Sequence, residues 1–263
     1  MAFAERAAAI LRDDERVRAL WLTGSLAAGT ADAASDVDLR AAIRAEDFAT
    51  LEQWWPSLLD QITPMVWRRR WPGSPQEAII GAISTDYLRF DLVMQSATDT
   101  TPRALEAARL LFDKDSLAAQ LDFTLPIQHH PLAQMPYLVE EFIRLVGMLP
   151  IVVERDDVPM GMEGHFALHS MLISLLLAEN GIDRAATGKR HVVALLNEDQ
   201  RAVLAGVPPL EPTMGSVIQA RLIYARLFLP RARRLMEANG LIYPVAFEDA
   251  TRQHLAETLQ LSL

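Results

Sequence analysis

The first half of the chain changes its hydrophobic period after one helix-like segment. Apolar residues recur at helical spacing through residues 3–14, which predicts an amphipathic helix. After it, short runs rich in Val, Ile, Leu and aromatic residues each end in turn-forming residues, a pattern typical of strands. We expect strands at residues 17–24, 37–43, 62–71, 77–84 and 87–95, and a helix at 45–61.

Two short turn sequences suggest how these strands are arranged. Pro-Gly-Ser-Pro-Gln at 72–76 and Ser-Thr-Asp at 84–86 are typical of the tight connections in a meander. The third, fourth and fifth expected strands are therefore predicted to be consecutive neighbours. The amino-terminal half reads as a helix-flanked mixed β-sheet.

The second half contains no pattern that predicts a strand. Residues 123–136 carry three prolines and two histidines without clear periodicity, so we place a domain boundary there. The expected fold class is α+β, with a sheet domain at 1–125 followed by an all-α helical bundle at 126–263. Helices are expected at residues 137–149, 164–179, 199–206, 214–238 and 247–263.

Composition agrees with two globular domains and narrows the chemistry. The 263 residues suffice for two domains of about 100–200 residues each, and 51% of them are hydrophobic. The chain contains no cysteine, which excludes disulfides, thiolate zinc sites and a cysteine nucleophile. Any catalysis therefore depends on oxygen and nitrogen groups.

The charge and the absence of long apolar segments bear on partners and location. A formal net charge of -9 argues against non-specific nucleic-acid binding, which needs clustered Lys and Arg. The amino terminus lacks the apolar stretch of a signal peptide, and no segment approaches the roughly 18 apolar residues of a membrane span. We expect a cytoplasmic protein without membrane or nucleic-acid partners.

Two aspartates stand at the start of the second expected strand. Asp36 and Asp38 are two residues apart, so in a strand they point to the same face. Two like charges this close are unfavourable unless a cation lies between them, and Mg²⁺ prefers carboxylate, water and phosphate oxygens. The Asp-x-Asp pattern also occurs in solvated loops, so the pair needs support from elsewhere in the chain.

That support comes from two neighbouring patterns. Gly24 and Ser25 end the first strand where a helix or tight turn should begin, which leaves backbone N–H groups free to hold a phosphate. Asp91 lies in the apolar strand 87–95, where a carboxylate is costly to bury without a partner. If this strand lies beside that of Asp36 and Asp38, three carboxylates converge on one or two metal ions, a site suited to phosphoryl or nucleotidyl transfer.

The combination resembles a known signature. Gly-Ser, a short spacer, Asp-x-Asp and a third acidic residue on a later strand are similar to the pattern of the polymerase beta-like nucleotidyltransferase superfamily. The chain looks like the antibiotic-modifying branch, and residues 108–121 also resemble the stretch after the catalytic sheet of aminoglycoside and lincosamide nucleotidyltransferases. The matching positions are Gly24, Ser25, Asp36, Asp38 and Asp91.

The resemblance implies an activity and roles for residues. It implies magnesium-dependent transfer of a nucleoside monophosphate, usually AMP from ATP, to a hydroxyl of a small acceptor, plausibly an aminoglycoside or related antibiotic. Asp36 and Asp38 would hold the magnesium ions, and Ser25 with the local backbone would hold the terminal phosphates. Asp91 would either complete the metal site or act as general base. The helical half would bind the acceptor and form the cleft.

Three charged residues are further site candidates, each with a plainer alternative. Arg89 shares a face with Asp91 and would steady a phosphate or pair with that carboxylate. Lys189 precedes a helix and would reach the triphosphate, although basic residues are also common there. Glu163, expected near a helix start, would contact the acceptor or merely favour the positive helix end.

Two other groups have mainly structural interpretations. The basic run at residues 68–70 is typical of a solvated edge strand. His165 and His169 are four residues apart, but a zinc site needs a third ligand, and packing inside the bundle is the simpler interpretation.

The same residues are compatible with two other functions. One is a protein- or RNA-directed nucleotidyltransferase of the antitoxin or regulatory type. The other is a nucleotide-binding regulator without turnover, which the intact set of three carboxylates disfavours. The acceptor, the nucleotide and the oligomeric state are not indicated by the sequence.

Overall fold

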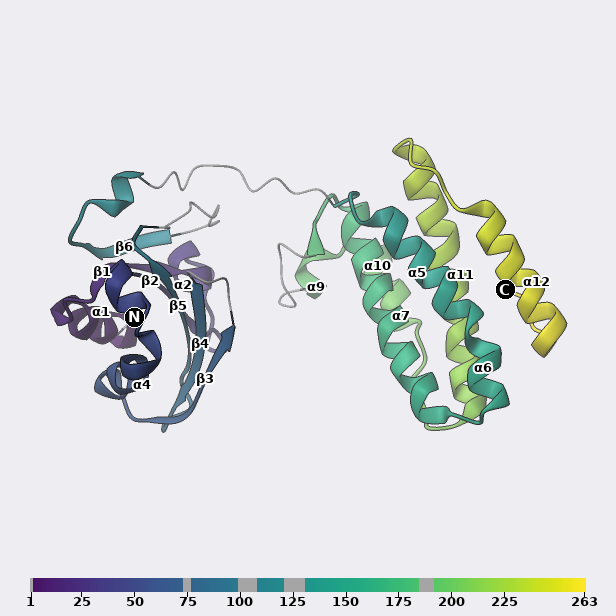
Figure 1. The fold of residues 1–263 in the computed structure, drawn as a ribbon. Coiled ribbons are helices and arrows are strands. Elements are labelled where there is room, and N and C mark those ends of the chain that lie inside the picture. Colours follow the sequence, from purple (N-terminus) through teal and green to yellow (C-terminus); the bar gives the residue numbers. More distant parts are fainter. Residues whose placement is uncertain (1, 73–76, 99–107, 121–130, 185–191) are drawn as a thin grey trace. The chain divides into compact units, whose positions relative to one another are not determined.

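The computed structural model describes residues 2–72, 77–98, 108–120, 131–184 and 192–263 (Figure 1). The chain divides into two compact units, Met1–Ile127 and Gln128–Leu263. The boundary expected from the sequence, between residues 125 and 126, lies outside the described residues.

The first unit is a six-stranded mixed sheet with helices. The strand order is β3-β4-β5-β2-β1-β6, so β3 and β6 are the edges (Figure 1). Its elements are α1 (Ala2–Asp13), β1 (Val17–Thr23), α2 (Gly24–Ala28), β2 (Val37–Ile43), α3 (Ala45–Phe48), α4 (Leu51–Ile62), β3 (Met65–Pro72), β4 (Glu77–Ser84), β5 (Arg89–Ser96), β6 (Ala108–Asp113) and the 3-10 helix η1 (Leu117–Gln120).

The pairing of the strands confirms the expected meander. β3 pairs with β4 and β4 with β5, both antiparallel. β5 then lies parallel to β2, which brings together two strands that are separated in sequence by α3, α4, β3 and β4. β1 pairs antiparallel with β2 on one side and with β6 on the other.

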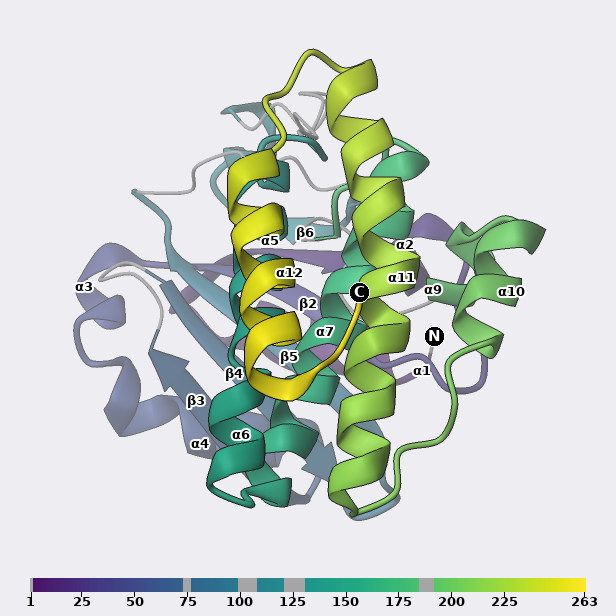
Figure 2. The ribbon, with the colours of Figure 1, turned by 90° about the vertical axis from the view of Figure 1, so that its right-hand side faces the viewer.

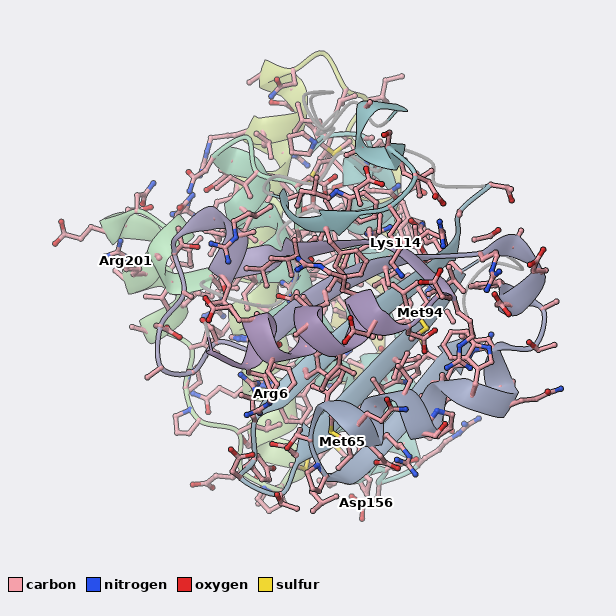
Figure 3. All side chains as sticks on the ribbon, turned by 90° about the vertical axis from the view of Figure 1, so that its left-hand side faces the viewer. Arg6, Met65, Met94, Lys114, Asp156 and Arg201 are labelled. Carbon is pink, nitrogen blue, oxygen red and sulfur yellow. The ribbon has the colours of Figure 1, made fainter. Side chains whose placement is uncertain are left out.

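One face of this sheet is covered by helices and forms the core of the unit. Alternate residues of β2, including Leu39 and Ala41, are fully buried and pack with Leu92 and Met94 of β5. The apolar faces of α1 and α4 close over them, as Figure 3 shows with Met94 labelled near these helices. Because strand side chains alternate between faces, Asp38 and Arg40 of β2 and Asp91 and Gln95 of β5 lie on the opposite face.

Three details of the sheet unit differ from the sequence prediction. Strand β6 was not predicted, because its side chains are mostly partly exposed and follow no clear alternation. The helix expected at 45–61 is two helices, α3 and α4. The strand expected from residue 62 begins at Met65, since Ile62 is buried as the end of α4 and Pro64 disfavours helix at Thr63.

The second unit consists of helices throughout the part of it that the structure describes. Helices α5, α7, α11 and α12 run alongside one another (Figure 2). The helices are α5 (Met135–Gly147), α6 (Leu149–Glu154), α7 (Val158–Glu179), α9 (Val192–Leu195), α10 (Glu198–Ala205), α11 (Met214–Ala238) and α12 (Val245–Leu259). The predicted α+β fold class, a mixed sheet followed by a helical bundle, is confirmed.

The helical unit has its own core. Phe142 of α5 stacks on Phe228 of α11 with ring centroids 3.8 Å apart, and both side chains are fully buried. α7 begins earlier than expected because Asp157 caps it, accepting a hydrogen bond of 3.0 Å from the Met160 amide. Among the helices in the described ranges, none combines the length and the apolar character needed to cross a membrane.

Candidate active site

Three carboxylates meet on the face of the sheet opposite to α1 and α4. Asp38 of β2 and Asp91 of β5 are direct register partners in the parallel pair. Asp36 lies immediately before β2 and shares the face of Asp38. One oxygen from each of the three carboxylates lies within 4.8 Å of the other two, Asp36 is buried, and the other two are half-buried. The expected convergence of these three residues is therefore present.

Gly24 is required at this site by the position of Asp38. A β-carbon on Gly24 would lie 2.0 Å from the Asp38 Oδ2 atom, far inside van der Waals contact, and Gly24 has a φ of +65°. Glycine is thus needed twice, for the left-handed backbone and for the space that the carboxylate occupies. The sequence suggested only close approach of a phosphate; the structure shows a close approach of Asp38.

Ser25 follows Gly24 in the short helix α2. Its Oγ atom is shielded from solvent and has no hydrogen-bond partner within the described parts of the chain. An unsatisfied buried hydroxyl carries a cost unless a ligand or ordered water completes it. This is the residue for which the resemblance implies a contact with terminal phosphates.

The loop between α2 and β2 is held by specific hydrogen bonds. Asp32 accepts bonds from the Ala34 amide (2.9 Å) and the Ser35 hydroxyl (3.0 Å). Arg89, at the start of β5, donates from its guanidinium to the Ala34 carbonyl. Arg89 therefore connects β5 to the loop that presents Asp36, which is a positioning contact that neither of the two sequence-based interpretations of Arg89 included.

A row of register partners extends the site toward the β3 edge. Asp38 is opposite Asp91, Asp91 is opposite Gly81 of β4, and Gly81 is opposite Arg69 of β3. A β-carbon on Gly81 would meet Asp91 Oδ1 at 3.3 Å and the Trp71 ring at 2.7 Å, so Trp71 lies over this glycine on the face of the carboxylates.

The basic run at residues 68–70 is divided between the two faces of β3. Arg68 pairs with Asp60, and Arg70 pairs with Glu52, both carboxylates coming from α4. Arg69, between them, points to the face that carries Trp71 and the carboxylates, because strand side chains alternate. Arg69 is exposed and forms no ion pair with the described residues.

Sequence reasoning thus missed two contributors to the site. It treated the three arginines as a single edge feature and passed over Trp71, which is 38% exposed and lies 5.9 Å from Trp67 between ring centroids. The order Trp-Arg-Arg-Arg-Trp was a sufficient signal, since the alternation of side chains along a strand places Trp67, Arg69 and Trp71 on one face.

Further along β2, β4 and β5, away from the carboxylates, the same face of the sheet is occupied by polar side chains that pair with one another. Arg40, two residues after Asp38, lies 3.8 Å from Glu77 of β4, and Gln95 donates a hydrogen bond of 2.7 Å to the same carboxylate. Glu77 and Gln95 are buried. Trp21 packs nearby with Leu117 of η1. The carboxylate site therefore occupies a limited part of the sheet face rather than a long open surface.

The predicted site residues of the helical unit have different outcomes. Lys189 lies outside the described residues. Glu163 is exposed in the second turn of α7, not at its start, so the favourable charge at the helix end is that of Asp157. Glu163 lines a cavity of the bundle together with Arg221 of α11.

The two histidines of α7 flank a buried tyrosine. The Tyr224 hydroxyl lies 3.0 Å from His169 Nδ1 and 3.4 Å from His165 Nε2. Burial lowers the pKa of His165 and of His169, and it raises the pKa of Tyr224 to about 12. The contacts of both histidines with Tyr224 agree with the packing interpretation. In the described residues, the group of three or more side chains placed to hold a metal is Asp36, Asp38 and Asp91.

Comparison with known proteins gives similarity only to solved structures. Neither a protein-family model nor a curated protein matches the sequence. The chain is similar to an aminoglycoside 6-adenyltransferase from Bacillus subtilis, at 14% identity and a TM-score of 0.42 over 96% of this chain and 95% of the other. It is also similar to a nucleotidyltransferase-like protein from Exiguobacterium sibiricum, at 14% identity and a TM-score of 0.35 over 98% and 77% of the two chains.

Proposed function

We propose that the protein is a magnesium-dependent nucleotidyltransferase that moves a nucleoside monophosphate, AMP from ATP in the first instance, to a hydroxyl of a small acceptor. The observation that carries the proposal is the convergence of Asp36, Asp38 and Asp91, one oxygen of each within 4.8 Å of the others. Nucleotidyl transfer needs positioning and charge neutralisation more than covalent chemistry, and a carboxylate cluster beside a phosphate-binding loop supplies both.

The residues present suit magnesium. All three ligand groups are hard carboxylate oxygens, which Mg²⁺ prefers, and Asp38 and Asp91 leave one side of the cluster half-exposed for water and phosphate oxygens. Asp36 and Asp38 would hold the ion, with Asp91 as a further ligand or as base. When bound, magnesium neutralises the phosphate oxygens and the charge that develops on them during transfer.

The chain's own groups supply the remaining functions. If Asp91 acts as the base, its carboxylate accepts the proton of the acceptor hydroxyl. The hydroxyl oxygen then forms a bond to the α-phosphorus, and the bond from this phosphorus to the pyrophosphate oxygen breaks. The Ser25 hydroxyl, which has no hydrogen-bond partner among the described residues, donates to a terminal phosphate oxygen. Arg69 is the nearest cation in the row that contains Asp91 and supplies a guanidinium for the released pyrophosphate.

The acceptor side rests on the sequence resemblance. An aminoglycoside or related antibiotic is the acceptor class that it implies, with Glu163 as a contact and Lys189 and Arg89 as phosphate contacts. In the structure Arg89 binds the loop that presents Asp36, so its removal should disturb the carboxylates as well. These assignments remain predictions that an activity assay addresses.

The test is an assay of the full chain with Mg²⁺, labelled ATP and a panel of aminoglycosides and lincosamides. We expect pyrophosphate release together with a labelled acceptor. Asp38→Asn should lower transfer by about three orders of magnitude, the scale seen when charge stabilisation is removed from an active site. Asp13→Asn is the matched control, because Asp13 is exposed at the end of α1.

Each alternative outcome is informative. Label on protein or RNA instead of a small acceptor would favour the macromolecule-directed enzyme. ATP binding without transfer to any acceptor would favour a regulator. Full turnover of Asp38→Asn would contradict the assignment of the site itself.

A further inference from the structure

A cavity lies within the helical unit, between α5, α6, α7 and α11. Its volume is about 290 Å³, and its wall is mainly apolar. Two charged side chains line it, Arg221 of α11 and Glu163 of α7. The apolar lining comes from Leu145, Met148, Val152, Met160 and Ala167.

Arg221 is the unusual member of this lining. Only 3% of the residue is exposed, and its guanidinium donates to the Leu145 carbonyl. This carbonyl is the single hydrogen-bond acceptor of Arg221 within the described residues, although a guanidinium has five N–H donors. No carboxylate of the described residues forms an ion pair with it, and burial lowers the pKa of Arg221 to about 10.

The residues next to Arg221 leave space for its guanidinium and do not neutralise its charge. A β-carbon on Gly164 would lie 2.7 Å from the Arg221 Nη2 atom, so the missing side chain makes room for the guanidinium. His165 follows and is also basic; burial first, and then the charges of His169 and Arg221, lower the pKa of its imidazole. Burying a charge without an ion-pair partner is unfavourable, and a bound anion would offset that cost.

Another arginine of the same helix forms the ion pairs that are usual for a shielded guanidinium. Arg231 is also largely shielded, but it lies 3.0 Å from Glu179 and pairs in addition with Asp199. α11 therefore carries one arginine with two carboxylates and another with none among the described residues, and the arginine without carboxylates faces a cavity.

We propose that this cavity binds a small organic monocarboxylate, whose carboxylate meets the guanidinium of Arg221 and whose apolar body packs against Met148, Val152 and Met160. The proposal concerns the helical unit alone. It shares Glu163 with the proposed acceptor contact, but its test does not require nucleotidyl transfer. The N–H groups of Arg221 that have no acceptor among the described residues match the two oxygens of a carboxylate, the strongest pairing of this kind.

The chemistry of the wall favours a single negative charge on the ligand. One guanidinium balances one carboxylate, whereas a phosphate monoester carries more charge and would also be repelled by Glu163 at the same cavity. The volume is near the lower end of ligand-binding cavities, which start at about 300 Å³, so the apolar body must be short.

The test uses sodium octanoate and calorimetric titration of the full chain, with 1-octanol and octyl phosphate as matched probes below micelle-forming concentrations. We expect one site for octanoate, and at least tenfold weaker binding of 1-octanol. Arg221→Gln should weaken octanoate binding at least tenfold and remove the preference over 1-octanol. Arg226→Gln is the control, because Arg226 is an exposed arginine of the same helix outside this cavity.

Two other variants keep the test decisive if Arg221→Gln fails to fold. Ala167→Leu fills the cavity without changing charge and should abolish octanoate binding. Glu163→Gln removes the competing negative charge and should tighten octanoate binding about twofold to threefold. Equal binding of octanoate by the parent chain and Ala167→Leu, no preference over 1-octanol, no binding at all, or tighter binding of octyl phosphate would each overturn the proposal.

Discussion

The two units of this protein bring charged groups together in opposite ways. In the sheet unit, three negative charges meet on one face of the sheet, placed there by strand register. In the helical unit, one positive charge is buried in a cavity formed by several helices. A third case, Glu248 of α12, is buried but receives Arg233, Arg252 and Tyr243 as partners.

This difference distinguishes buried charges that the protein itself neutralises from charges that a ligand would neutralise. Glu248 has enough donors from the protein itself, so it needs no ligand. Clustered like charges and a buried arginine without a carboxylate instead raise the free energy of the folded protein. A bound ligand of opposite charge lowers it. The comparison predicts a cation in the first unit and an anion in the second, and each half of it can be tested separately.

The largest expected effect tests whether the two charge sites belong to separate cores. Phe142→Ala removes one ring of the buried Phe142–Phe228 stack and should lower the stability of the helical unit by about 3–5 kcal/mol. Urea unfolding should show this loss, while stabilisation of the sheet unit by Mg²⁺ persists. Phe166→Ala, at an exposed position, is the control. Loss of the Mg²⁺ effect in Phe142→Ala would show that the units are coupled.

The next effect concerns the glycine under the carboxylates. Gly24→Ala forces Asp38 away from its position and should lower transfer by about 100-fold, the usual cost of a displacement near 1 Å in an active site. Gly29→Ala is a matched control, because Gly29 also has a positive φ, whereas a β-carbon added there would meet no described atom within 4 Å. Equal activity of the two variants would remove the special role of Gly24.

Binding of the cation should be detectable from protein stability, without an activity assay. At a Mg²⁺ concentration about 100 times its dissociation constant, the sheet unit should gain about 2.7 kcal/mol of stability. Thermal unfolding with and without a chelator measures this gain. Asp38→Asn should abolish it, whereas Asp13→Asn should retain it, and a gain that survives in Asp38→Asn would place the ion elsewhere.

A smaller effect separates the two faces of β3. Arg69→Gln should raise the KM for ATP about tenfold, equivalent to about 1.4 kcal/mol, if its guanidinium contacts the phosphates. Arg68→Gln should leave the KM unchanged, since Arg68 pairs with Asp60 on the helical side of the sheet. Steady-state kinetics over a range of ATP concentrations distinguishes the two variants, and an equal change in both would contradict the assignment of faces.

The smallest effect concerns the satisfied charge, Glu248. Burial raises its pKa, but the hydrogen bonds from Tyr243, Arg252 and Arg233 outweigh burial, so the pKa is lowered from its ordinary value of 4.5. A lowered pKa in the folded state means stability that is present above 4.5 and is lost as the pH falls below it. Thermal unfolding of Glu248→Gln should therefore show a shallower loss of stability in acid, and an unchanged acid profile would count against this network.

The hydrophobic pattern predicted the sheet better than its edges. Buried strands such as β2 and β4 have compact apolar runs, and their predicted and observed ranges coincide. β6 escaped prediction because an edge strand with one buried residue, Phe112, needs no such run. The start of β3 was wrong because Ile62 is apolar in either a helix or a strand, and only its burial as the end of α4 distinguishes them.

The site residues also divide into those that the sequence predicted and those that only the tertiary structure revealed. Asp36, Asp38, Gly24 and Ser25 are close in sequence, so their proximity followed from a strand and a turn. Asp91 was found as a charge in an apolar strand, and its place beside Asp38 required β5 to pair with β2, which the structure shows. Arg69 entered the site only through Gly81, a residue whose importance is the absence of a side chain.

The sequence by itself determined the α+β composition, the positions of the carboxylates along their strands and the chemistry that three carboxylates suit. These are local properties, since strand alternation and side-chain charge depend on neighbours in the chain. Only the tertiary structure decided that Arg221 is buried without a carboxylate from the described residues, because that depends on helices whose residues are far apart in sequence. No local pattern distinguishes Arg221 from Arg231, ten positions further along α11, yet Arg231 pairs with two carboxylates and Arg221 faces a cavity.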